Sequence, residues 1–81
     1  MMILNITYNG RSADYPLDGD VHLADADVRR IAVEVVRAGG VRGLHVPELA
    51  DGAFDHFVVD RLGAGATARI YLRPKVPFGR G

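Results

Sequence analysis

The sequence predicts an α+β domain in which one helix covers a sheet, with elements in the order strand, strand, helix, strand, strand. Three observations carry this prediction: an Asn-Gly turn between two alternating segments, one amphipathic stretch with helical spacing, and two later segments rich in strand-forming residues. With 81 residues, the chain has the length of one domain with one small core.

Residues 25–39 predict the helix. Apolar side chains recur there at intervals of three and four residues, which places them on one helical face. They are Val28, Ile31, Ala32 and Val35, with Val36 at the margin. We expect Asp25 to cap the first turn and Gly39 to end the helix, because glycine adopts positive φ at little cost. We also expect Ile31 and Val35 to be almost fully buried against the sheet.

The start of the chain predicts a β-hairpin around Asn9 and Gly10. A two-residue type I′ turn needs positive φ at both central positions, and Asn-Gly is the strongest short signal for it. This turn places Leu4 opposite Tyr15 on the helix side, in a set of pairs that is mostly apolar. The predicted strands are residues 2–8 and 11–17, and the polar pairs on the other face are Asn5 with Asp14 and Thr7 with Ser12.

Residues 54–62 and 66–73 predict the third and fourth strands. The fourth segment alternates, so Ile70 and Leu72 should face the core and the side chains between them should face outward. Pro74 should end this strand, because proline cannot donate a hydrogen bond to a sheet ladder. The connection between the helix and the third strand contains glycine and proline and is expected to be irregular.

The composition excludes several classes of function. Ten basic and ten acidic residues cancel, whereas nucleic-acid-binding domains normally carry a basic excess. The chain has no cysteine, which excludes a disulfide framework, a thiol nucleophile and a cysteine-ligated metal. No apolar run approaches the roughly 20 residues that span a bilayer. We therefore expect neither a nucleic-acid partner nor a membrane partner.

No residue pattern predicts catalysis, a metal site or a cofactor. Ser12 is the only serine, and it lacks the flanking glycines of a nucleophile elbow. The three histidines lie on separate segments, without the paired spacing of zinc sites. They are His22, His45 and His56. We expect a protein that is not an enzyme and that uses neither a metal nor a cofactor.

Three segments give the chain a resemblance to the ubiquitin-like β-grasp family. MILNITYNGRSADYPL stands in the place of that family's opening hairpin, VRRIAVEVVRAG in the place of its helix, and ARIYLRP in the place of its last strand. The resemblance covers the whole chain in topology. It implies a mixed sheet of four to five strands covered by one helix, over residues 1–73, and a flexible tail over residues 74–81.

The resemblance also implies a function. The chain is similar to small bacterial ubiquitin-like modifiers and sulfur carriers, which would make it a cytoplasmic protein activated at its C-terminal glycine. A partner enzyme would adenylate the carboxylate of Gly81, and Gly79 would help the tail to enter a narrow channel because glycine has no side chain. The partner would be an adenylating or conjugating enzyme. The family ends in Gly-Gly, whereas this sequence ends Gly79-Arg80-Gly81, so only the last glycine matches.

A second hypothesis is a non-conjugated interaction module with the same fold. The outward side chains of the last strand combine a tyrosine with flanking arginines, which is a common composition of protein-binding surfaces. These residues are Thr67, Arg69, Tyr71 and Arg73, and Asn5 and Thr7 join them if the first and last strands pair. A small regulatory subunit of an enzyme complex is a third hypothesis.

Overall fold

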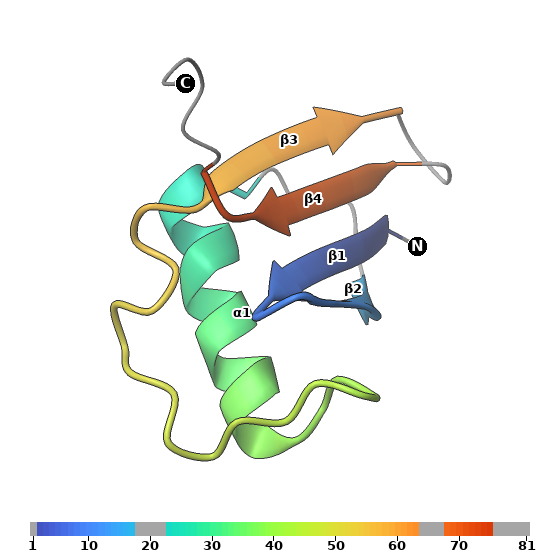
Figure 1. The fold of residues 1–81 in the computed structure, drawn as a ribbon. Helices are drawn as coiled ribbons and strands as arrows, with labels where there is room; N and C mark the ends of the chain where they lie inside the picture. The colour runs from blue at the N-terminus through green and yellow to red at the C-terminus, as the bar shows by residue number, and fades with distance from the viewer. Residues whose placement is uncertain (1, 18–22, 64–67, 76–81) are drawn as a thin grey trace.

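The computed structural model describes residues 2–17, 23–63 and 68–75. In chain order they form β1 (Met2–Tyr8), β2 (Arg11–Leu17), α1 (Asp25–Ala38), β3 (Val58–Leu62) and β4 (Arg69–Arg73). The strands make one sheet in the order β2-β1-β4-β3, and α1 packs across one of its faces (Figure 1). β1 and β4 run parallel, whereas the two outer pairings are antiparallel. The predicted α+β class, with one helix on a mixed four-stranded sheet, is confirmed.

The hairpin has the predicted register. Asn9 and Gly10 both adopt positive φ, at 51° and 77°. Leu4 pairs with Tyr15, as the two-residue loop requires. Leu4 is fully buried, and Tyr15 packs partly buried against the same core. The Asn-Gly turn therefore decides which face of β1 enters the core.

The buried side of α1 differs from the predicted one. Ile31 and Val35, expected to be almost fully buried, are only partly buried. Val33, which the spacing placed outside the apolar stripe, is 4% exposed. The prediction was wrong because it allowed for a sheet alone, whereas the loop of residues 39–57 also packs along the helix. The fully buried helix residues are Val28, Ala32 and Val36.

The ends of α1 follow the prediction at one terminus only. Ala24 rather than Asp25 is the N-cap, and the Asp27 carboxylate accepts a hydrogen bond from the Ala24 N–H at 3.3 Å. Asp25 is instead the first residue of the helix, and Arg61 of β3 donates to its carboxylate at 2.7 Å. At the other end, Gly39 has φ 82°, so the predicted glycine stop is confirmed.

The third strand is shorter than predicted, because Phe54 serves the core as part of a turn. The Phe57 N–H donates to the Phe54 carbonyl at 3.0 Å, and β3 begins only at Val58. Phe54 is fully buried, and its ring meets those of Phe57 and Tyr8 at centroid distances of 4.8 and 5.6 Å. An edge-on aromatic cluster of this kind is stabilising beyond the area that it buries.

The last strand keeps the predicted alternation. Ile70 and Leu72 are buried, and β4 ends at Arg73, directly before Pro74. Residues 66 and 67 of the predicted strand lie outside the described residues, as do residues 76–81 of the predicted tail. None of the described residues belongs to a helix that is long and apolar enough to cross a membrane.

Candidate protein-binding surface

The face of the sheet opposite α1 carries alternate side chains of all four strands, and we call it the open face. Its residues are Ile3, Asn5 and Thr7 of β1, Ser12, Asp14 and Pro16 of β2, Val58, Asp60 and Leu62 of β3, and Arg69, Tyr71 and Arg73 of β4. The register aligns a row across the sheet in which Tyr71 lies between Asn5 and Asp60. The structure thus brings the described members of the predicted binding face together.

Arg69 contacts an aspartate of the hairpin and a tyrosine of its own strand. Its Nη2 donates to both carboxylate oxygens of Asp14, at 3.3 Å each. Its Cζ lies 5.7 Å from the centroid of the Tyr71 ring, within the range of a cation–π contact. Tyr71 and, to a smaller extent, Asp14 raise the pKa of Arg69, so its guanidinium stays protonated. Its Nε is buried and has no hydrogen-bond partner in the described part of the chain.

Arg73 is held by an aspartate of the neighbouring strand β3. Its Nη2 donates to the carboxylate of Asp60, which stands across from Tyr71 on β3. Both arginines of the open face are therefore paired with aspartates, and their formal charges cancel. Such a surface presents no excess of positive charge with which to attract phosphate groups or nucleic acid.

The hairpin side of the open face is a connected polar network. The Nδ2 of the Asn5 side chain donates to Asp14 at 2.8 Å, and the Ser12 hydroxyl donates to the side-chain Oδ1 of Asn5 at 3.1 Å. The hydroxyls of Thr7 and Ser12 lie 3.0 Å apart. Asp14 thus receives hydrogen bonds from both Asn5 and Arg69, which joins the hairpin to β4 on this face. Ser12 is one member of this network, and its hydrogen bonds go to Asn5 and Thr7 rather than to a histidine.

One large apolar side chain is exposed on the open face. Leu62, at the end of β3, is 59% exposed and pairs in register with Arg69. Ile3 is the register partner of Arg69 on β1, so Arg69 has an apolar residue beside it on each neighbouring strand. A tyrosine and paired arginines beside exposed apolar surface make up a composition typical of protein interfaces.

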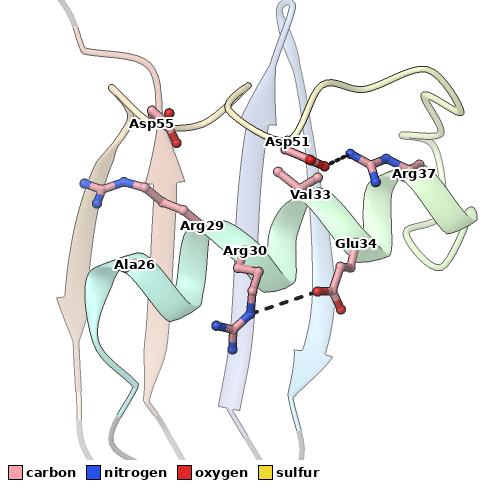
Figure 2. Close-up of a pocket in the computed structure, with 8 residues that line it drawn as sticks. All are labelled: Ala26, Arg29, Arg30, Val33, Glu34, Arg37, Asp51 and Asp55. Carbon is pink, nitrogen blue, oxygen red and sulfur yellow. Dashed lines mark hydrogen bonds and ion pairs between the residues drawn. The ribbon is translucent and has the colours of Figure 1, made fainter.

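A groove of about 500 Å³ lies on the far side of the helix, between α1 and the loop that precedes β3 (Figure 2). Arg37 donates to Asp51 at 2.6 Å, and Arg29 donates to the carbonyl of Phe57 at 2.9 Å. Each of these arginines holds the loop against the helix. The groove mixes three arginines with three carboxylates, and Val33 lies at its floor.

Several residues considered in the sequence do not converge. His45 and His56 are exposed on separate parts of the loop. Among the described residues, no three potential metal ligands cluster. The other residues considered, His22, Thr67, Gly79 and Gly81, lie outside the described residues.

Sequence reasoning did not include Asp14, Asp60 and Leu62 among the site residues of the open face. Asp14 was assigned correctly to the polar hairpin face, but its contact with Arg69 depends on the pairing of β1 with β4. Asp60 and Leu62 could not be assigned to a face, because the run Phe57-Val58-Val59 hides the alternation. The signal that would have found them is the register between β3 and β4, which the sequence does not contain.

Comparison of the chain with models of protein families, with curated proteins and with solved structures finds no match.

Proposed function

We propose that this protein is a β-grasp interaction module that holds a protein partner on its open face. The observation that carries the proposal is the position of Tyr71, between two arginine–aspartate pairs on the sheet face that α1 does not cover. The β-grasp assignment is supported by the strand order β2-β1-β4-β3 and by the parallel pairing of β1 with β4. We also propose a cytoplasmic location and no catalytic activity.

The paired charges define what the partner offers. Arg69 and Arg73 already bind aspartates, so a partner gains little by presenting another carboxylate to them. Tyr71 and the neighbouring Leu62 instead provide apolar and aromatic contact area, with a phenolic hydroxyl for one directional hydrogen bond. Residues of this kind carry most of the binding energy in protein interfaces. The partner should therefore place an apolar or aromatic side chain over Tyr71.

The test is selective capture by matched variants. The immobilised protein is exposed to a lysate of its source organism, and captured proteins are identified for the wild type, Tyr71→Ala and Arg30→Ala. Arg30 is exposed on the opposite side of the molecule and serves as the control. A protein that is captured by the wild type and by Arg30→Ala, but lost with Tyr71→Ala, supports the proposal. Equal capture by all three variants, each shown to be folded, would contradict it.

A second candidate is the modifier or carrier activated at Gly81. It is favoured by the way the chain leaves β4, an interior strand of the sheet, through exposed Pro74 and Lys75. In this function the sheet anchors the tail, and an adenylating enzyme joins AMP to the terminal carboxylate, with release of pyrophosphate from ATP. Incubation with ATP and an adenylating enzyme encoded beside this protein should give an adduct with Gly81 and none with Gly81→Phe. If neither the Gly81 protein nor Gly81→Phe forms an adduct, the carrier function is contradicted and the interaction module remains.

A further inference from the structure

The two edges of the sheet differ in what they offer to another strand. The pair that flanks a two-residue hairpin turn is hydrogen-bonded, and bonded and non-bonded pairs alternate from there. Tyr8 and Arg11 form the bonded pair beside the turn. This alternation leaves the backbone groups of Ser12, Asp14 and Pro16 directed to the free edge of β2. Proline has no N–H, so this edge has no backbone donor at Pro16.

The free edge of β3 keeps all its donors. The Ile3 N–H donates to the Ala68 carbonyl at 3.3 Å, so the even-numbered residues of β4 bond to β1. The odd-numbered residues of β4 therefore bond to β3, where their register partners are Val58, Asp60 and Leu62. The backbone groups of Val59 and Arg61 are left at the free edge. No backbone hydrogen bond from another described segment reaches them.

The side chains of these two residues do not obstruct that edge. Arg61 donates to the carboxylate of Asp25 at 2.7 Å and to the carbonyl of Leu23 at 2.6 Å, so it is held at the start of the helix. Val59 packs partly buried against the core. Proteins commonly protect an edge strand with proline or with outward charge. Pro16 gives β2 this protection, whereas the charged groups of β3 are bound to the chain's own residues.

We propose that β3 pairs antiparallel with β3 of a second copy of the chain, which joins the two sheets into one. A two-fold axis through Asp60 pairs Val59 with Arg61 of the other copy, so each free N–H meets a free carbonyl. The same axis places Leu62 against Val58 of the other copy, which covers the exposed leucine. The proposal uses backbone groups at the edge and not Tyr71, and Leu62 is the one residue that it shares with the contact area proposed for the partner of the open face.

The charges at the centre of this interface balance. The two Asp60 side chains face each other across the axis, and like charges directly opposite are destabilising. Each of these carboxylates is bound by Arg73 of its own chain, so the centre holds two acidic and two basic groups. Stable dimers bury roughly 1,200–2,000 Å². A pair of five-residue strands offers less than that, so the dimer is weak and forms with rising concentration.

The experiment needs only the protein itself. Sedimentation velocity from micromolar to millimolar concentration should show the average mass rising toward that of a dimer. Leu62→Lys should remain monomeric throughout, because its ammonium group would oppose the apolar contact with Val58. Ala38→Lys adds the same charge at an exposed site on the helix and should associate like the wild type. Circular dichroism would establish that all three proteins are folded.

Amide hydrogen exchange locates the contact. The Val59 and Arg61 amides should exchange several-fold more slowly at high concentration, whereas the Ser12 and Asp14 amides on β2 should not change. A mass that does not depend on concentration would overturn the proposal. Association of Leu62→Lys to the same extent as the wild type, or slowing confined to Ser12 and Asp14, would also overturn it.

Discussion

The guanidinium of Arg37 donates two hydrogen bonds to the carbonyl oxygen of Leu49, at 3.0 Å from Nε and 2.7 Å from Nη2. Arg29 donates two hydrogen bonds to the carbonyl oxygen of Phe57 in the same way, at 3.3 Å from Nε and 2.9 Å from Nη2. The two arginines lie on the same side of α1 and fasten both ends of the segment between residues 49 and 57. Two charged residues of the helix thus hold an irregular loop in place through hydrogen bonds to its backbone.

Arg37→Ala should lower the free energy of unfolding by about 1–3 kcal/mol, because the Leu49 carbonyl loses both of its charged donors. Denaturant unfolding followed by circular dichroism measures this loss. Arg30→Ala is the matched control on the same helix. Its ion pairs with Asp27 and Glu34 are exposed, at 65% for the Arg30 side chain, so its effect should stay within about 0.5 kcal/mol. Equal losses for the two variants would show that the hydrogen bonds from Arg37 to the Leu49 carbonyl do not stabilise the fold.

Val36→Ala and Val35→Ala test which side of the helix is buried. The two changes delete the same atoms at adjacent positions, but Val36 is fully buried and Val35 only partly so. Val36→Ala should cost about 2–3 kcal/mol, from lost burial and the cavity left behind. Val35→Ala should cost at least about 1 kcal/mol less. Thermal melts of both variants give the comparison, and a larger loss for Val35→Ala would place the sheet against the other side.

Gly10→Val should destabilise the protein by about 1–2 kcal/mol through the backbone alone. Gly10 has φ 77°, and a Cβ added there would meet no heavy atom within 4 Å, so crowding plays no part. Gly10→Asn is the control, because asparagine tolerates the left-handed conformation far better than valine does. Chemical denaturation of the two variants separates the effects. Similar losses for Asn and Val would mean that the turn is not of the type I′ form.

The open face should acquire anion affinity when its aspartates are neutralised. Asp14→Asn combined with Asp60→Asn leaves Arg69 and Arg73 without acidic partners and removes two negative charges. This variant should be retained on a heparin column at low salt and released as screening increases, whereas the wild type should pass through. Asp51→Asn with Asp55→Asn changes the net charge equally but on the helix side of the molecule. If both double variants are retained alike, the anion affinity is not particular to the open face, since Asp51→Asn frees Arg37 in the same way.

The hairpin could be predicted in full because its determinants are local. Asn9 and Gly10 specify the turn, and the turn specifies each cross-strand pair, so Leu4 opposite Tyr15 followed from the sequence alone. The facing of α1 could not be predicted with the same accuracy. Val33 is buried by a loop that has no periodic pattern of its own and that is held to the helix by Arg29 and Arg37. Spacing within the helix contains no information about that second covering.

The open face was predictable strand by strand but not as a surface. The alternation of β4 places Arg69, Tyr71 and Arg73 on one side, and the structure confirms that placement. Their neutralisation depends on Asp14 and Asp60, which are distant in sequence and are brought alongside only by strand pairing. The sequence therefore predicted a tyrosine with flanking arginines, whereas the assembled sheet pairs each arginine with an aspartate.

The parallel contact between Ile3 and Arg69 has a consequence for synthesis on the ribosome. β4 lies between β1 and β3, so β3 has no neighbour in the sheet until β4 has been made. The hairpin and the helix can form early from local contacts, but the closing strand arrives after nearly the whole domain has been translated. Pairings between residues so far apart in sequence are slow to form, because the intervening chain must first be ordered. The sheet can therefore be completed only when β4 has left the exit tunnel and pairs with both β1 and β3.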